Sequence, residues 1–197
     1  MRTKDPANEQ LQRERLLRSA WKLFREKGYV NTTMEDILRE ANCSKGRFYY
    51  YFHSKAELLD YLHTIFDEKY VESYRELSTS LSAAEKLIGV GTYMFRFMDE
   101  EIGCELLSQL FIAQLNRTAG VMFWADDLAY PRLVTELAED GIRKGELRSD
   151  FSAQEIADAI LGVARSILFS WCLRNGDFRL SEAGPASLSV FLHSFLP

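Results

Sequence analysis

Apolar residues recur at helical spacing along nearly the whole chain, and no segment alternates apolar and polar residues as a half-buried strand does. Near the N-terminus this apolar stripe stops just before Gly28, and glycine commonly follows the last turn of a helix. The stripe consists of Leu16, Leu17, Ala20, Leu23 and Phe24. The pattern therefore predicts an all-α protein whose first long helix ends at Gly28.

Several helix starts are marked by Ser or Thr followed at the third position by Asp or Glu, which is the pattern of a capping box. Four segments fit it: Thr33–Asp36, Ser54–Glu57, Ser82–Glu85 and Ser152–Glu155. The first predicts a short helix that reaches Ala41. After a turn at Asn42-Cys43, Ser44 is expected to cap a second short helix. The box at Ser54 predicts a long helix that runs to about Leu77.

The remaining chain predicts five more helices, separated by turn residues such as Gly145 and Asn175-Gly176. They lie near residues 83–100, 102–117, 128–145, 153–174 and 182–196. Residues 117–127 are expected to be a connection with exposed aromatic side chains. There is no internal repeat and no low-complexity tract, so a solenoid or a disordered tail is not expected.

Charge is distributed very unevenly along the 197 residues. Residues 1–55 hold 12 Lys and Arg against 7 Asp and Glu, whereas residues 56–197 hold 12 against 22. The whole chain has a net charge of −5, which hides a basic N-terminal segment of +5. A local excess of basic residues favours a polyanionic partner. Together with the two short helices and the turn predicted between Thr33 and Ser54, this charge leads us to expect a helix-turn-helix DNA-binding domain over residues 1–55 and a larger helical domain over residues 56–197.

The sequence also favours a cytoplasmic protein with no membrane-spanning segment. The polar start MRTKDPANEQ lacks the apolar core of a secretory signal. The longest apolar stretch, Ile156–Leu173, is interrupted by Asp158 and Arg165. The three cysteines stand far apart without a CxxC pair, which is typical of a reducing compartment: Cys43, Cys104 and Cys172. Isolated cysteines are more often small buried side chains than thiol sensors.

The second short helix carries the side chains best suited to reading DNA. Two helices joined by a tight turn can place the second helix in the major groove. Arg47 can donate two hydrogen bonds to guanine, and Gly46 allows the backbone to approach closely. Ser44 and the free N–H groups of the helix start suit phosphate oxygens, and Lys55 is placed to meet another phosphate.

Five consecutive aromatic residues follow, from Phe48 to Phe52. Successive helical residues point about 100° apart, so Tyr49, Tyr50 and Tyr51 cannot all be buried. At least one phenol is expected to project toward solvent or DNA. Phe48 and Phe52 are expected to pin the helix to the apolar residues of the two preceding helices.

Gly28-Tyr29, Thr32-Thr33, Ile37, Ala41 and the run from Ser44 to Leu58 resemble, without a gap, the DNA-binding domain of the TetR (tetracycline-repressor-like) family. The resemblance covers about residues 10–60. It implies that Thr33 contacts a phosphate, and that Tyr51 and Lys55 hold the sugar–phosphate backbone. It also implies which side chains face the groove: Lys45, Arg47 and Tyr49. The chain departs from the family pattern at three positions, none of which removes the motif: Asn42, Cys43 and Tyr51.

The helix near 153–174 is apolar nearly all round, so one side is expected to meet its own chain and another side a partner. The family resemblance implies a homodimer through this helix and the one near 182–196. A two-fold dimer would present two reading helices to a palindromic operator. The alternative is a monomer in which this helix is central and fully buried.

The resemblance also implies a small-molecule effector site in the acidic part of the chain. The candidate lining residues are Tyr74, Tyr93, Phe97, Phe111, Gln114, Trp124 and Tyr130. Aromatic walls with a few polar groups suit an apolar ligand, although each of these residues also fits an ordinary core. The many carboxylates favour either a cationic ligand or a solvated acidic face.

No phosphate-binding glycine loop, nucleophile elbow or metal motif is present, so neither an enzyme nor a cofactor is expected. The sequence therefore favours a DNA-binding transcriptional regulator, a ligand-responsive repressor in particular. Two alternatives stay open. One is a helical small-molecule-binding protein or enzyme with a vestigial DNA-binding head. The other is a regulator controlled by a protein partner instead of a small molecule.

Overall fold

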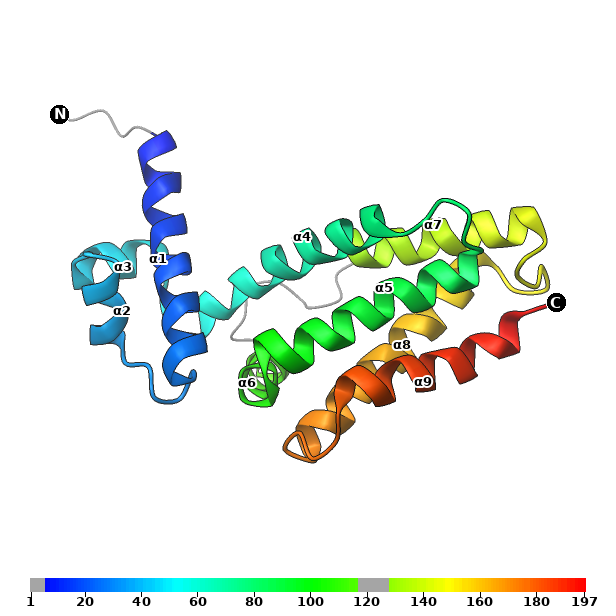
Figure 1. Ribbon diagram of the computed structural model, residues 1–197. Helices are drawn as coiled ribbons and strands as arrows, with labels where there is room; N and C mark the ends of the chain where they lie inside the picture. Colours follow the sequence, from blue (N-terminus) through cyan, green and yellow to red (C-terminus); the bar gives the residue numbers. More distant parts are fainter. Residues whose placement is uncertain (1–5, 117–127) are drawn as a thin grey trace. The chain divides into compact units, whose positions relative to one another are not determined.

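The computed structural model describes residues 6–116 and 128–197, and all the secondary structure in these two ranges is helical (Figure 1). The all-α prediction is therefore confirmed. The N-terminal helices are α1 Pro6–Lys27, α2 Met34–Glu40, α3 Lys45–Tyr51, the 3-10 helix η1 Ala56–Asp60 and α4 Tyr61–Glu76. The later helices are α5 Ala83–Phe97, the π-helical turn η2 Met98–Ile102, α6 Cys104–Leu115, α7 Ala129–Lys144, α8 Ala153–Leu173, α9 Leu180–Leu192 and the 3-10 helix η3 His193–Phe195.

The chain forms two compact units. The first unit holds the residues up to Leu62 together with α6 from Gln109 onward, and the second holds His63–Ser108 with α7, α8 and α9. The sequence pattern placed the boundary between residues 55 and 56. The first unit extends further because η1 contacts α1 and buries Leu58 and Leu59.

Most of the predicted helix ends are confirmed by their capping contacts. Gly28 follows α1 with a φ of 81°, a conformation that glycine adopts without steric cost. Complete capping boxes start α2, α5 and α8 at Thr33, Ser82 and Ser152. Asn42 takes a φ of 48°, so it does supply the left-handed turn residue between α2 and α3.

The box predicted at Ser54 is wrong in detail. Ser54 Oγ accepts a hydrogen bond from Glu57 N at 3.4 Å, but the Glu57 carboxylate accepts from His53 N instead of Ser54 N. The segment that follows is the 3-10 helix η1, and α4 begins only at Tyr61. The single long helix expected from Ser54 is therefore two consecutive elements.

Helices α5 and α9 of the second unit approach each other closely at two points. A Cβ on Gly91 of α5 would lie 2.5 Å from Leu188 of α9, and one on Gly184 of α9 would lie 2.4 Å from the ring of Phe95. These distances are too short for any side chain, so α5 and α9 approach each other where both offer glycine.

Helix α8 has one buried and one exposed face. It packs against α7 and α9, and within the described ranges it is the one helix long and apolar enough to cross a bilayer. Its buried residues are Ile156, Ala157, Ile160, Leu161, Ala164, Leu168 and Trp171. Its exposed residues include Gly162, Ser166, Phe169 and Leu173, which follow one another at helical spacing. Helices α7 and α9 of the same chain thus cover one side of α8, as the sequence pattern predicted.

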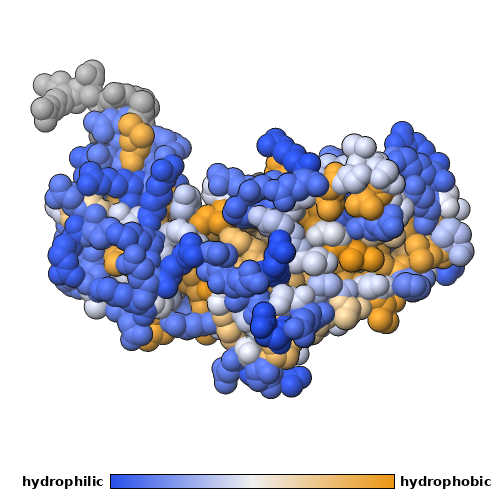
Figure 2. Space-filling model, viewed as in Figure 1, coloured by the Kyte–Doolittle hydropathy of each residue, from blue (hydrophilic) through white to orange (hydrophobic). Residues whose placement is uncertain are grey.

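The two units differ in surface character. Figure 2 shows mainly hydrophilic side chains over α1, α2 and α3, and apolar side chains at the surface among the helices of the second unit. The exposed apolar residues of α8 and α9 are Phe169, Leu173 and Val190, of which Leu173 and Val190 are 69% and 76% exposed.

Candidate nucleic-acid interface and ligand region

The start of α3 is a polar surface built on a buried aromatic support. Ser44 Oγ accepts a hydrogen bond from Arg47 N at 3.3 Å and so caps the helix. Phe48 is fully buried and Phe52 nearly so, which fixes the helix to the core of the first unit as predicted. The residues before them are exposed: Ser44, Lys45, Gly46 and Arg47. A Cβ at Gly46 would meet nothing within 4 Å, so the backbone there is open to a large partner.

The three tyrosines diverge around α3, as helical geometry requires. Tyr49 and Tyr50 are 46% and 55% exposed, whereas Tyr51 is half-buried with its ring 5.0 Å from that of Tyr50. Tyr50 Oη also donates a hydrogen bond to Glu9 on α1 at 3.3 Å. The ring of Tyr49 instead packs edge-on against buried Phe48, at 5.4 Å between centroids. An exposed phenol on a supported ring suits the groove-facing role that the sequence predicts for Tyr49.

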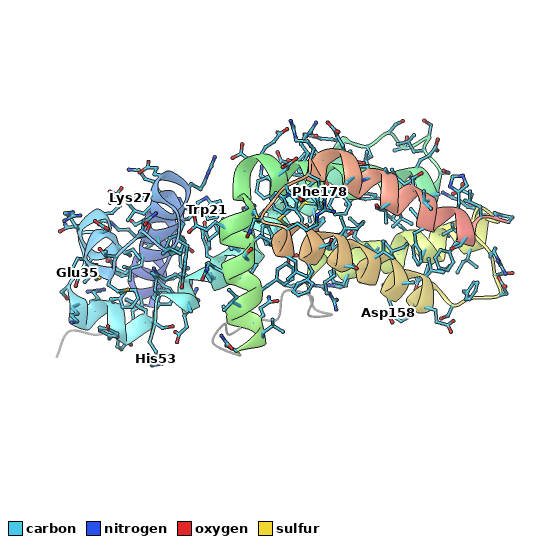
Figure 3. All side chains as sticks on the ribbon, turned by 90° about the horizontal axis from the view of Figure 1, so that it is seen from below. Trp21, Lys27, Glu35, His53, Asp158 and Phe178 are labelled. Carbon is cyan, nitrogen blue, oxygen red and sulfur yellow. The ribbon has the colours of Figure 1, made fainter. Side chains whose placement is uncertain are left out.

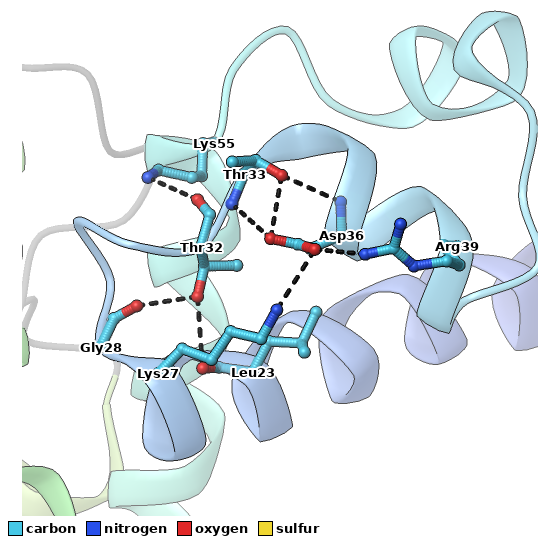
Figure 4. A network of polar contacts seen from close by, with 8 residues as sticks. All are labelled: Leu23, Lys27, Gly28, Thr32, Thr33, Asp36, Arg39 and Lys55. Carbon is cyan, nitrogen blue, oxygen red and sulfur yellow. Dashed lines mark hydrogen bonds and ion pairs between the residues drawn. The ribbon is translucent and has the colours of Figure 1, made fainter.

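Thr33 is held tightly at the start of α2 (Figure 4). Its hydroxyl and its N–H both donate to Asp36 Oδ2, at 2.9 Å and 3.1 Å. These hydrogen bonds, the backbone one first, lower the pKa of Asp36 to about 2, and an ion pair with Lys27 at 3.2 Å adds to the effect. Both hydrogen-bond donors of Thr33 thus point to Asp36 in this structure. The phosphate contact predicted for Thr33 remains a prediction.

Lys55 has a structural task inside the first unit. Its ammonium donates to the carbonyl oxygens of Tyr29 at 2.8 Å and Thr32 at 2.9 Å, and it lies 4.1 Å from the centroid of the Tyr29 ring. These contacts tie the start of η1 to the loop between α1 and α2, and Figure 4 shows the one with Thr32. The phosphate contact predicted for Lys55 is not tested by them.

Ion pairs neutralise one part of the basic surface and leave another part open. On α1 and α2, Lys22 pairs with Glu40 at 2.8 Å, and both Lys27 and Arg39 pair with Asp36. Figure 3 shows Lys27 on α1 and Glu35 on α2. At α3 the situation differs: in the part of the chain that the structure describes, Lys45 and Arg47 form no ion pair.

Arg15 on α1 is a basic residue that the sequence pattern did not single out. Burial raises the pKa of the Cys43 thiol, and the positive charges of Arg47 and Arg15 act against that rise. Both guanidinium groups therefore act on the same turn between α2 and α3. In the sequence, the signal for Arg15 was its place on the polar face of α1, and such a face resembles any solvated helix surface.

The aromatic residues predicted to line an effector site have diverse surroundings. Tyr130 is buried and stacks on Tyr70 with ring centroids 3.6 Å apart, and burial raises the pKa of both phenols. Phe97 packs edge-on against Phe66 at 6.3 Å. Two other predicted lining residues belong to the second unit. The ring centroid of Tyr93 lies 5.7 Å from the guanidinium carbon of Arg96, and Tyr74 is 36% exposed.

The other predicted lining residues lie elsewhere. Phe111 and Gln114 are on the part of α6 that groups with the first unit. Gln114 Nε2 is buried and has no hydrogen-bond acceptor among the described residues. Trp124 lies outside the residues that the structure describes. The structure thus leaves the predicted effector site as an expectation.

The structure adds a feature that the sequence did not predict, an acidic hollow on α4. It has a volume of about 630 Å³, and none of the predicted effector residues lines it. Its lining residues are Asp67, Glu68, Val71, Glu72, Arg75, Glu76 and Ala129. Asp67 Oδ1 accepts a hydrogen bond from Ala129 N at 3.0 Å. The spacing of Glu68, Glu72 and Glu76 by four residues was the available signal.

Comparison with known proteins identifies the first unit. Residues 16–62 match the family described as bacterial regulatory proteins, tetR family. This match includes α2, α3 and all the predicted DNA contacts from Thr33 to Lys55.

Longer similarities extend over almost the whole chain. The HTH-type transcriptional repressor KstR2 of Rhodococcus jostii is 24% identical over 190 residues, which are 95% of this chain and 93% of the repressor. The structure of the Thermus thermophilus TetR-family repressor FadR with lauroyl-CoA is 25% identical, with a TM-score of 0.73 over 94% of this chain and 95% of that one. A TetR-family regulator from Pectobacterium atrosepticum shares the fold at 21% identity, with a TM-score of 0.79 over 98% of both chains. The sequence, the helix-turn-helix geometry and these similarities agree that the chain is a DNA-binding transcriptional regulator of the TetR family.

Proposed function

We propose that this regulator is a cytoplasmic, homodimeric repressor that binds a palindromic operator and is released by a small-molecule effector. The observation that carries the proposal is the start of α3, where Lys45 and Arg47 are exposed on a helix whose opposite side is fixed by buried Phe48. A fixed helix with free cationic ends suits the major groove, because phosphate contacts position the helix and base contacts select the sequence.

Sequence selection is assigned to Arg47 and Tyr49, and phosphate binding to the residues around them. A guanidinium can donate to the O6 and N7 acceptors of one guanine. Ser44, Lys45 and Tyr50 are exposed as well. Arg15 adds positive charge to the turn before α3.

The second copy of the chain is proposed to cover the exposed faces of α8 and α9. Phe169, Leu173 and Val190 are large apolar side chains at the surface, which a soluble protein usually covers. A Cβ added to Gly162 would meet nothing within 4 Å, and a small residue there permits a close helix approach. Two copies related by a two-fold axis would explain a palindromic operator.

The effector is proposed to be a small molecule with a long apolar body. The similar FadR of Thermus thermophilus was solved with lauroyl-CoA, and a fatty acid metabolism regulator of Bacillus subtilis is 22% identical over 181 residues. The aromatic side chains of the second unit suit an acyl chain. The carboxylates of the acidic hollow would repel the phosphates of coenzyme A there, so a cationic amphiphile is the matched test compound.

Release from the operator would follow if the effector binds one conformation of the dimer more tightly than the DNA-binding one. Helix α4 is proposed as the link, since it starts at Tyr61 in the first unit and carries the acidic hollow in the second. A compound that binds tightly and leaves operator affinity unchanged would refute this mechanism.

Selection of the preferred duplex from a random pool tests the function with the full-length protein. We expect an inverted repeat that is bound at least about 10³-fold more tightly than random duplex at the same salt concentration. Lauroyl-CoA and dodecyltrimethylammonium are then added separately to the complex, and loss of binding identifies the effector class. If no duplex is enriched, the protein is a helical small-molecule-binding protein or enzyme with a vestigial head.

A further inference from the structure

Two cysteines that are far apart in the sequence meet in the second unit. Cys104 is the first residue of α6, and Cys172 lies in the last turn of α8. The Cys104 thiol donates to the carbonyl oxygen of Trp171 at 3.8 Å, and that carbonyl group is bonded directly to the backbone nitrogen of Cys172. Besides burial, which is the largest cause, the neighbouring Ser108 hydroxyl and Cys104 thiol also influence the pKa of the Cys172 thiol.

The surrounding backbone fixes this arrangement. Gly176 N donates to the same Trp171 carbonyl oxygen at 2.9 Å, and a Cβ on Gly176 would lie 3.2 Å from Cys104 Cβ. Trp171 Nε1 donates to the carbonyl oxygen of Phe178 at 3.0 Å, which closes the turn between α8 and α9. Phe178 is labelled in Figure 3. The turn that follows α8 therefore packs directly on Cys104, next to the residue that precedes Cys172.

We propose that Cys104 and Cys172 are an oxidation site at which a hydroperoxide forms an intrachain disulfide. Cys104 Sγ, as thiolate, attacks the peroxide oxygen, the O–O bond breaks, and Cys104 becomes a sulfenic acid while the peroxide is reduced to water or an alcohol. Cys172 Sγ then attacks the sulfenic sulfur, the S–O bond breaks, and the thiol proton leaves with the hydroxide as water. The peroxide accepts two electrons, and each sulfur loses one.

The different surroundings of the two sulfurs assign their order. Burial raises the pKa of the Cys172 thiol to about 11, so Cys172 stays protonated at neutral pH and acts second. Ser108 Oγ lies 3.9 Å from Cys104 Sγ, so it is placed to hold the departing proton. The site is separate from the DNA-binding residues, and its chemistry does not depend on the proposed function.

Thiol counting and peptide mapping of the full-length protein test the proposal. Excess hydrogen peroxide is added to reduced protein, and free thiols are then alkylated under denaturing conditions. We expect the thiol count to fall from three per chain to one, and a non-reduced digest to contain the peptide linked between Cys104 and Cys172. Retention of all three thiols, or a disulfide between two chains, would overturn the proposal.

Three serine variants make the assignment specific. Cys43→Ser is the matched control, because Cys43 lies in the first unit, and it should still form the linked peptide. Cys104→Ser and Cys172→Ser should each lose it. In Cys172→Ser a dimedone-type probe should trap the sulfenic acid on Cys104, whereas a probe adduct on Cys172 in Cys104→Ser alone would contradict the assigned order. Since the wild-type digest needs no substitution, a variant that folds poorly does not affect the main result.

Discussion

In the first unit, α3 holds Lys45 and Arg47 in solvent on a helix anchored by Phe48, whereas in the second unit α8 and α9 expose Phe169, Leu173 and Val190. The first surface is cationic and polar, and the second is apolar. These properties suit different kinds of partner, because a charged surface gains by replacing counterions on a polyanion and an apolar surface gains by leaving water. The net charge of the whole chain, −5, describes neither surface.

The comparison also separates two uses of basic residues within the first unit. Lys22, Lys27 and Arg39 form ion pairs with carboxylates of α2, and Lys55 binds two backbone carbonyl groups. These contacts stabilise the unit from within. The charges at the start of α3 have no such contact among the described residues. Substitutions at either kind of residue should therefore have different consequences for folding and for binding.

Removing the aromatic anchor should destabilise the helix that carries the cationic surface without changing the charge of the chain. Phe48→Ala deletes a fully buried ring and should cost about 3–5 kcal/mol in the free energy of unfolding of the first unit. The control is Tyr50→Ala, which removes a ring that is 55% exposed and should cost much less. Hydrogen–deuterium exchange resolved by peptide should show faster exchange in residues 6–62 of Phe48→Ala. If the second unit exchanges as it does in wild type, the destabilisation is confined to the first unit. Faster exchange in both units would contradict this contrast between the two units.

Placing a carboxylate on the apolar surface should separate the two copies of the chain. Leu173→Glu puts a charge on a side chain that is 69% exposed in one copy, so the fold of the single chain should tolerate it. In the proposed dimer the same carboxylate would be buried without a partner, which costs about 3 kcal/mol, or about 100-fold in the dissociation constant.

Leu11→Glu is the matched control, because Leu11 is 64% exposed and lies on α1 in the first unit. Sedimentation equilibrium should show a weakened dimer for Leu173→Glu and an unchanged one for Leu11→Glu. The opposite pattern would place the interface between copies on the first unit.

Two basic residues near α3 should affect DNA binding in different ways. Arg47→Ala should cost about 1–3 kcal/mol at one base pair of the operator and relax the preference there. Lys55→Ala should weaken binding to all duplexes alike and lower the slope of log affinity against log salt by about 0.9 if Lys55 also meets a phosphate. Fluorescence anisotropy with single-base operator variants at several salt concentrations measures both effects.

The structure adds a further expectation for Lys55. Its hydrogen bonds to Tyr29 and Thr32 should make Lys55→Ala less stable than wild type by about 1–3 kcal/mol, because two partly buried carbonyl groups lose a charged donor. A variant with lower stability and an unchanged salt slope would make Lys55 a structural residue only. A reversal of the Arg47 and Lys55 patterns would contradict both roles.

These contrasts also show what the sequence could predict. The caps at Thr33, Ser44, Ser82 and Ser152 were predictable, because each depends on residues within about one helical turn. The burial of Phe48 and Phe52 was predictable because apolar residues four apart lie on the same face of a helix. The contacts of Lys55 were not, because its carbonyl partners lie 23 and 26 residues earlier.

In the second unit, too, contacts between distant segments could not be predicted from the sequence. The ring of Tyr130, which is predicted to line an effector site, stacks on Tyr70 from another helix, and the sequence did not predict this contact. Cys104 and Cys172 looked isolated because no local motif links them, and they meet only when α6 and the end of α8 come together. At Ser54 even the local pattern failed, since the Glu57 carboxylate found an alternative donor, His53 N.

The smallest expected effect concerns the carboxylate that braces the start of α2. Hydrogen bonds from Thr33 and the ion pair with Lys27 lower the pKa of Asp36 from its ordinary value of 3.8 to about 2. A carboxyl group with a lowered pKa stabilises the folded state above its unfolded pKa, and this stabilisation disappears as the pH falls toward the folded pKa. For Asp36 the loss therefore falls between about pH 4 and pH 2.

Asp36→Asn should remove that part of the pH dependence and leave the first unit less stable at neutral pH. Glu35→Gln is the control, because it also deletes one carboxylate from α2 but is exposed and forms no ion pair with another described residue. Urea unfolding followed by circular dichroism between pH 2 and pH 5 gives the slope of the unfolding free energy for each protein. The slope of Asp36→Asn should be shallower than that of wild type, while Glu35→Gln should keep it. If both variants changed the slope equally, the pH dependence would come from the general charge balance of the first unit and not from the contacts of Asp36.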